Sequence, residues 1–187
     1  MNGPAQLPLA DETAEIKTDV LVIGGGNAAL CAAISARREG AEVMIVEAAP
    51  KFYRGGNTRH TRNLRCAHDK GNEILTGPYP EEEFWDDLMR VTGGETDEDL
   101  ARFTIEQSKE LWDWMNEAGV RFQKPLGGTL NLGRTNAFFL GGGRAMLNAL
   151  YDTAEKLGVE IRYDTAVTSL NIEDGFFKSA EIEGPDG

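Results

Sequence analysis

The residues of this chain best suited to chemistry begin with a glycine-rich turn. Gly24 and Gly26 follow an apolar run, Ala29 lies three residues further on, and Glu47 closes a second apolar run. Gly24 permits a tight strand-to-helix turn, Gly26 lets the backbone approach a phosphate, and Ala29 allows close packing of helix and strand. The helix N-terminus offers N–H groups to a pyrophosphate, and Glu47 can accept hydrogen bonds from ribose hydroxyls. This spacing predicts a dinucleotide-binding βαβ unit.

A second candidate site is the segment of residues 54–65 (RGGNTRHTRNLR), which carries four arginines and a histidine in a chain of net charge −12. The segment follows the second apolar run, so we expect it to lie beside the bound nucleotide. Asn57, Thr58 and the backbone at Gly56 could bond the second phosphate. Arginine binds phosphates and carboxylates through bidentate geometry. A solvated basic loop is the alternative interpretation.

Hydrophobic periodicity predicts the elements that must position these residues, in an α/β fold of the Rossmann type with a parallel sheet. The Asp174-Gly175 pair separates two alternating segments and predicts a C-terminal β-hairpin. The expected strands are residues 18–23, 42–47, 159–163, 166–172 and 176–183, and the expected flanking helices run from the glycine turn to residue 39 and over 141–157.

A helical and loop insertion is expected at about residues 70–140. It should contain a short helix at 81–91 and a longer one at about 96–118 that a capping box opens. Residues 50–70, which include the basic segment, are predicted to be a loop. The aromatic residues of the longer helix are expected to pack in the core: Phe103, Trp112 and Trp114.

Composition and charge narrow the class of protein. The 187 residues are 41% hydrophobic and acidic overall, which suits a globular domain and argues against general binding of nucleic acid. Cys31 and Cys66 form neither a disulfide framework nor a zinc pattern, so we expect no metal and a reducing, cytoplasmic location. Residues 1–16 are expected to be a flexible tail, and residues 17–187 to form the domain.

Together these motifs resemble a known family of flavoproteins. The glycine turn 24–29 (GGGNAA), Glu47, the segment 55–58 (GGNT) and residues 141–143 (GGG) are similar to the FAD-binding domain of the fumarate reductase/succinate dehydrogenase flavoprotein family. The resemblance covers nearly the whole chain after the expected tail. It therefore implies a Rossmann-like FAD-binding domain.

Three further segments resemble the tricarballylate dehydrogenases within that family. They are residues 54–65, 79–85 (YPEEEFW) and 134–139 (RTNAFF). The flavoprotein part of the precorrin-3B synthases is the nearest competitor. The glycine motifs are generic to flavoproteins, whereas the basic segment is more specific.

The resemblance implies bound FAD and a set of residues that contact it. Asn57 stands where members with a covalent flavin carry a histidine, so the FAD is expected to be noncovalent. Glu47 is expected to bind the adenosine ribose, and the backbone of Val167 to read the adenine. The expected cofactor contacts are Gly24, Gly26, Asn27, Ala28, Glu47, Gly56, Asn57, Thr58 and Val167.

The resemblance also implies a reaction, in which hydride leaves tricarballylate or a related polycarboxylate to give the unsaturated acid. Electrons would pass to a membrane-bound iron–sulfur partner, with the protein cytoplasmic and associated peripherally with the inner membrane through that partner. Arg62 or Arg65, with His60, is expected to reach the substrate, while Arg59 stays nearer the phosphates.

The chain is expected to be incomplete relative to the family. The capping domain and the arginine that carries the catalytic proton would lie beyond Gly187, so no residue here is assigned to catalysis. We expect the 187-residue chain by itself to be inactive and poorly loaded with FAD. Two other functions stay open at this stage: a precorrin oxygenase on the same cofactor, and a nucleotide-binding module without catalysis.

Overall fold

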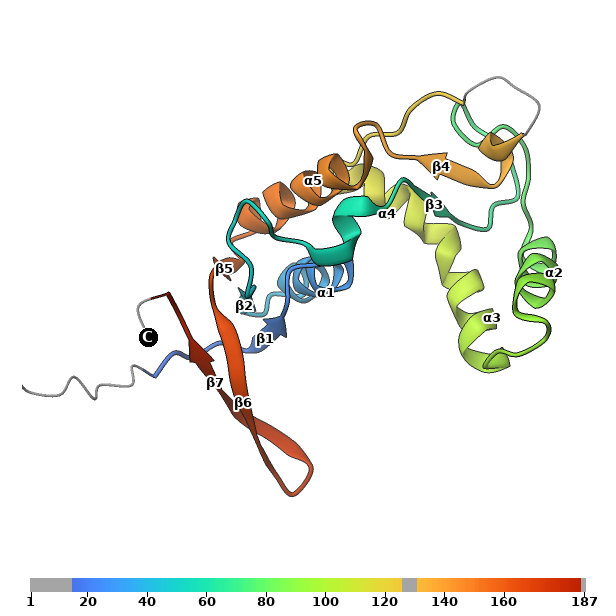
Figure 1. The fold of residues 1–187 in the computed structure, drawn as a ribbon. Coiled ribbons are helices and arrows are strands. Elements are labelled where there is room, and N and C mark those ends of the chain that lie inside the picture. Colours follow the sequence, from blue (N-terminus) through green and yellow to red (C-terminus); the bar gives the residue numbers. More distant parts are fainter. Residues whose placement is uncertain (1–14, 126–130, 186–187) are drawn as a thin grey trace, which may run out of the picture.

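The computed structural model describes residues 15–125 and 131–185. The expected N-terminal tail lies outside the described residues except for residues 15 and 16. The described chain is an α/β fold, as predicted, with a small parallel sheet, flanking helices and a C-terminal hairpin (Figure 1).

The parallel sheet has three strands: β1 (Val20–Ile23), β2 (Val43–Val46) and β5 (Glu160–Arg162). Their order is β1-β2-β5, so β2 lies in the centre, and all four of its side chains are buried. A continuous apolar run is typical of a parallel strand that is covered on both faces. The three parallel strands confirm the sequence prediction, although each is shorter than expected.

Two helices pack on this sheet and on each other: α1 (Asn27–Arg38) and α5 (Gly142–Lys156). Leu30 and Ile34 of α1, Ile45 of β2 and Leu150 of α5 are all 0% exposed and form the centre of the core. Full burial of such a side chain stabilises the fold by roughly 1.5–3 kcal/mol. This core fixes the N-termini of α1 and α5, and both helices begin beside the basic segment.

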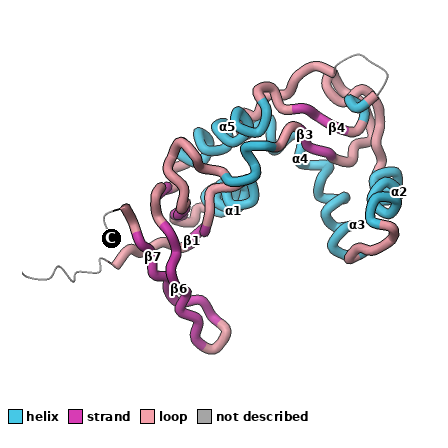
Figure 2. The backbone as a smooth tube through the Cα atoms, in the orientation of Figure 1, coloured by secondary structure: helices cyan, strands magenta, loops and turns pink. Residues whose placement is uncertain are grey.

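The basic segment contains more regular structure than a loop. Residues 56–60 form a 3₁₀ turn, η1 (Gly56–His60), and a short strand follows, β3 (Asn63–Arg65). β3 pairs antiparallel with β4 (Asn136–Phe138), separately from the parallel sheet (Figure 2). The prediction of a loop over residues 50–70 was wrong here, because a three-residue strand has no periodicity of its own and forms only when its partner arrives.

The insertion between β3 and β4 is mainly helical. It contains α2 (Glu81–Thr92), α3 (Glu98–Gln107) and α4 (Leu111–Glu117), with 3₁₀ turns η2 (Ser108–Glu110) and η3 (Leu132–Arg134). The single helix expected at 96–118 is therefore two helices joined by η2. The side chain of Asp97, rather than a box opened by Thr96, caps α3 by accepting from the Leu100 N–H at 3.0 Å.

The aromatic residues of this insertion divide between core and surface. Trp112 and Trp114 pack against the core, as predicted, and Trp112 stacks on Phe122 with the ring centroids 4.6 Å apart. Phe103 is 59% exposed, so its predicted place in the core was wrong. Helix α3 as a whole buries only Ile105.

The last described element is the predicted hairpin of β6 (Ala166–Glu173) and β7 (Phe176–Glu183). Asp174 and Gly175 both have positive φ, 52° and 81°, which is the backbone that a tight two-residue turn requires. The hairpin extends away from the parallel sheet in Figure 1, and several of its large apolar side chains are exposed.

Candidate functional site

The glycine turn after β1 has the geometry of an anion-binding helix start. Gly24 has φ +95° and donates its N–H to the Val46 carbonyl at 2.7 Å, so the chain turns sharply as it leaves the sheet. The N–H groups of Gly26, Ala28 and Ala29 find no acceptor among the described residues. Free N–H groups at the positive end of α1 are the donors that a pyrophosphate needs.

The basic segment lies against this helix start, as the sequence predicts. The Thr58 hydroxyl accepts a hydrogen bond from the Asn27 N–H at 3.1 Å, although the two residues are 31 positions apart. A Cβ on Gly26 would lie 3.5 Å from that same hydroxyl oxygen. The predicted cofactor residues of the glycine turn and of the basic segment are therefore brought together.

Glu47 lies at the carboxyl end of β2 and is 9% exposed. Its two carboxylate oxygens accept from the N–H of Ala49 at 2.9 Å and of Gly55 at 3.3 Å. An ionised carboxylate has about four acceptor positions, so Glu47 can hold the start of the basic segment and still accept from a ribose hydroxyl. Its role in ribose binding stays a prediction, now with a fixed position.

Gly25 is a site residue that the sequence analysis did not assign. The Tyr151 hydroxyl donates to the Gly25 carbonyl at 2.8 Å. A Cβ on Gly25 would lie 2.0 Å from the Tyr151 oxygen and 2.6 Å from a Glu47 oxygen, so no larger residue fits. Burial, and next the charge of Glu47, raise the pKa of the Tyr151 phenol well above its usual value, which keeps it a donor. Nothing in the apolar pattern of residues 141–157 distinguishes Tyr151 from a core residue.

Helix α5 supports the basic segment from the other side. Gly143 donates its N–H to the Thr61 carbonyl at 2.8 Å, and a Cβ there would lie 2.2 Å from the Thr58 carbonyl oxygen. Leu147 fills the space beside Gly55, where an added Cβ would lie 2.4 Å from its methyl carbon. The segment is thus fixed between the start of α1 and the first turns of α5.

The remaining predicted cofactor residues lie in η1 and at the start of β6. Gly56 and Asn57 are exposed in η1. Val167 is half-buried near the start of β6, two residues after Thr165, whose N–H donates to the Glu47 carbonyl at 3.1 Å. This bond places the beginning of β6 beside the carboxyl end of β2, where the adenosine half of the dinucleotide is expected.

The four arginines of the basic segment have different surroundings. Arg54 donates to Asn148 at 2.9 Å and lies 4.5 Å from the centre of the Tyr151 ring. Arg65 turns toward the insertion, where it lies 3.4 Å from Asp87 of α2.

The other two arginines make fewer contacts. Arg59 lies 5.6 Å from the centre of the Tyr53 ring. Arg62 and His60 are exposed, and neither joins an ion pair among residues 15–125 and 131–185. The segment therefore separates into arginines that hold the fold and side chains that remain available.

Other kinds of site find no support in the described part of the chain. No group of three or more His, Cys, Asp or Glu side chains there could hold a metal ion. None of the described helices is long and apolar enough to cross a membrane. The free N–H groups at the start of α1 and the acid at the end of β2 fit a dinucleotide.

Comparison with known proteins identifies that dinucleotide. Residues 19–186 match the family model described as FAD binding domain. A fumarate reductase (cytochrome) from Shewanella frigidimarina is 29% identical over 174 residues, which cover 89% of this chain and 30% of that protein. An NADH:fumarate oxidoreductase from Klebsiella pneumoniae is 27% identical over 81% of this chain and 17% of that protein. The chain thus spans less than a third of either relative.

Solved structures agree on the fold. A 3-ketosteroid-Δ4-(5α)-dehydrogenase from Rhodococcus jostii superposes with a TM-score of 0.79 over 94% of this chain and 44% of that one, at 23% identity. The open conformation of a flavocytochrome c3 fumarate reductase superposes with a TM-score of 0.74 over 89% of this chain and 30% of that one, at 26% identity. The chain belongs to the FAD binding domain family, its relatives are flavoproteins of the fumarate reductase/succinate dehydrogenase group, and its cofactor is FAD.

Proposed function

We propose that this chain is the FAD-binding part of a dehydrogenase that converts tricarballylate, or a related polycarboxylate, to the unsaturated acid. The observation that carries this proposal is the basic segment. It contacts the start of α1 through Thr58, and further cations follow at Arg59, Arg62 and Arg65. A substrate with three carboxylates needs several cationic partners, because burying it beside a flavin without them would be costly.

Within the segment, we assign the substrate contact to Arg62 with His60. Both side chains are exposed and follow directly on the residues beside the FAD site. Arg65 is already engaged by Asp87 and Tyr79, so its first role is to hold the insertion against β3. Bound FAD supplies the hydride acceptor, and these cations orient the carboxylates of the substrate relative to it.

The proposal extends to the electron acceptor and the location of the protein. We propose a membrane-bound iron–sulfur protein as acceptor, with the flavoprotein in the cytoplasm and held peripherally at the inner membrane through that partner. These assignments rest on the resemblance of residues 54–65, 79–85 and 134–139 to the tricarballylate dehydrogenases.

The deciding experiment uses the full-length flavoprotein without oxygen. Adding tricarballylate should bleach the flavin absorbance, and mass spectrometry should find a product lighter by two hydrogens. Succinate and a steroid serve as comparison substrates, since relatives include fumarate and steroid enzymes by name. Bound flavin that ignores tricarballylate but responds to a steroid would overturn the proposed substrate. A full-length protein that binds no flavin would leave only a nucleotide-binding or structural module.

A further inference from the structure

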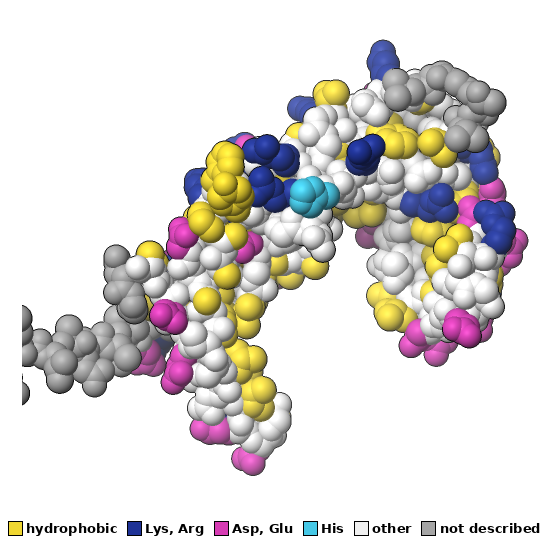
Figure 3. Space-filling model, in the orientation of Figure 1, with side chains coloured by type: hydrophobic (Ala, Val, Ile, Leu, Met, Phe, Trp, Pro, Cys, Tyr) yellow, Lys and Arg dark blue, Asp and Glu magenta, His cyan; other side chains and the backbone are white. Residues whose placement is uncertain are grey.

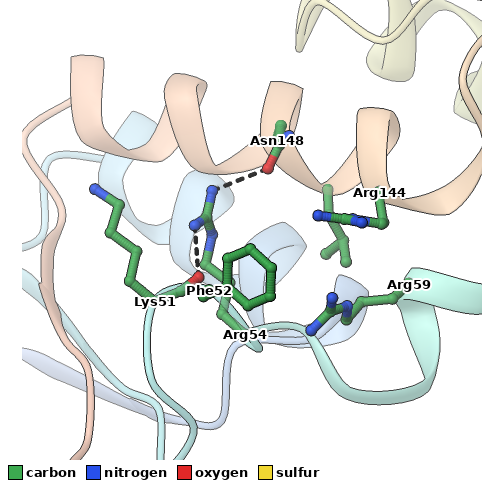
Figure 4. A pocket seen from close by; sticks show the side chains of 7 residues that line it. Lys51, Phe52, Arg54, Arg59, Arg144 and Asn148 are labelled. Atoms are coloured by element: carbon green, nitrogen blue, oxygen red, sulfur yellow. Dashed lines mark hydrogen bonds between the residues drawn. The ribbon is translucent and has the colours of Figure 1, made fainter.

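A second cluster of cations surrounds a pocket away from the glycine turn. The pocket has a volume of about 220 Å³ and lies between the chain that follows β2, η1 and helix α5 (Figure 4). At roughly 30 Å³ per water molecule this is room for about seven waters, or for a small organic or inorganic anion. The lining residues are Lys51, Phe52, Arg54, Arg59, Arg144, Leu147 and Asn148.

The lining carries four positive side chains and no carboxylate. Lys51 lies 3.5 Å from Glu155 at the rim, whereas Arg59 and Arg144 join no ion pair among the described residues. Such a cluster is unexpected in a chain of net charge −12. Like charges that converge on one cavity repel one another, so the arrangement favours an anion that neutralises them. Figure 3 shows Lys and Arg side chains gathered beside hydrophobic ones on this face.

One cation is built into the wall rather than left in solvent. Arg54 donates to the Lys51 carbonyl at 2.7 Å and to Asn148 at 2.9 Å, and its charge lies over the Tyr151 ring. Its Nε atom is buried without a hydrogen-bond partner among the described residues. The guanidinium is therefore held in one position with a donor still unused. Figure 4 shows Arg59 and Arg144 on the opposite side of Phe52 from Arg54.

This pocket and the predicted FAD site border the same segment through different residues. Gly55 contacts the pocket residue Leu147 on one side. On the other side the Thr58 hydroxyl bonds the Asn27 N–H at the start of α1. None of the predicted FAD contacts lines the pocket. Arg59, which was expected nearer the phosphates, lines this pocket instead, and the phosphates are expected at the glycine turn, so a separate anion is needed to neutralise the four cations.

We propose that this pocket, lined by Lys51, Arg54, Arg59 and Arg144, binds a small multivalent anion that bears phosphate or carboxylate groups. Arginine forks and a lysine point charge together suit an anion with at least two charged oxygens. Asn148 adds a neutral polar group whose amide can donate to the same ligand. The small volume and the acidity of the chain as a whole argue against nucleic acid.

Calorimetric titration of the FAD-loaded full-length protein tests the proposal, with inorganic pyrophosphate and citrate as separate probes at low ionic strength. At least one probe should bind with one site, and Arg144→Gln should weaken it about tenfold, equivalent to about 1.4 kcal/mol. Arg121→Gln is the matched control, since Arg121 is an exposed arginine outside the pocket. Tighter binding of pyrophosphate identifies a phosphate ligand, and tighter binding of citrate a carboxylate ligand.

Three results would overturn the proposal. The wild-type protein could bind neither probe. Arg144→Gln and Arg121→Gln could also weaken binding equally, which would indicate only a non-specific electrostatic attraction of anions to the protein surface. Alternatively Arg144→Gln could purify without flavin, which would assign the cluster to the cofactor. If Arg144→Gln does not fold, Lys51→Gln takes its place, because Lys51 is an exposed loop residue at the rim of the pocket.

Discussion

The hydroxyl of Tyr151 lies 2.8 Å from the carbonyl oxygen of Gly25, and this bond joins the middle of α5 to the turn that opens α1. The contact leaves no room for a side chain at Gly25, since an added Cβ would lie 2.0 Å from the phenol oxygen. The predicted FAD site is therefore shaped by a residue 126 positions away from the turn.

Gly25→Ala should damage the fold, while Gly26→Ala should damage mainly cofactor binding. The added methyl at Gly25 overlaps Tyr151 and Glu47, and overpacking of this kind costs about 1–3 kcal/mol. At Gly26 the nearest protein atom is 3.5 Å away, so the apoprotein tolerates the methyl. Denaturant unfolding of the apoproteins and the flavin content of the full-length variants check both expectations. Equal unfolding free energies for the two variants would contradict this assignment.

Thr58→Val should lower the free energy of unfolding of the apoprotein by about 1 kcal/mol. The substitution keeps the shape of the side chain but removes the acceptor of the Asn27 N–H, which acts as an external cap on α1. Thr61→Val is the matched control, because the Thr61 hydroxyl makes only a long bond, 3.4 Å, to the Asn63 carbonyl. An equal loss in both variants would show that the Asn27 bond contributes nothing.

Arg62→Gln and Arg65→Gln should affect different properties of the full-length enzyme. We expect Arg62→Gln to raise the half-saturating substrate concentration about tenfold or more with unchanged flavin content, through a loss of roughly 1.4 kcal/mol of carboxylate binding. Arg65→Gln should chiefly lower the thermal midpoint, because it removes the pair with Asp87 at 3.4 Å.

Asp87→Asn provides the control for the Arg65 result, since it breaks the same ion pair while every residue of the basic segment stays unchanged. If Arg65→Gln weakens substrate saturation strongly while Asp87→Asn does not, Arg65 rather than Arg62 contacts the substrate. If none of the three variants changes saturation, the arginines are surface charges that offset local acidity.

Stability should fall at alkaline pH because of Tyr79. This side chain is 0% exposed and donates to Asp87 at 2.8 Å, and burial, then that hydrogen bond, raises its pKa from 10 to about 12. The neutral phenol is favoured in the folded state, so its contribution is complete below pH 10 and is lost as pH rises through about 12. A shift of this size corresponds to about 2–3 kcal/mol.

Comparison of the wild-type protein with Tyr79→Phe isolates this contribution. Tyr79→Phe should be less stable near neutral pH, because Asp87 loses one of its donors. Its unfolding free energy should change less than that of the wild type as the pH rises from about 9 toward the raised pKa of about 12. Parallel pH dependences of the two proteins would show that Tyr79 does not titrate with the fold.

The sequence by itself determined the parts of this protein that depend on neighbouring residues. The turn at Gly24, the parallel strands and the Asp174-Gly175 hairpin were predicted correctly, because sterics and hydrophobic periodicity act within a few residues. The same local pattern led to the prediction of the FAD site, since the cofactor is expected to contact the turn, the helix start and the acid at the end of the next strand.

Only the tertiary structure decided which long-range contacts hold the segments around that site in place. Thr58 caps α1, β3 finds its partner in β4, and Arg65 turns to Asp87, each across a long separation in the chain. Phe103 also shows the limit of local patterns, because its helical spacing predicted a place in the core whereas the folded α3 leaves it exposed. Such contacts depend on how several elements pack at once, and the loop entropy of bringing them together is offset only in the assembled fold.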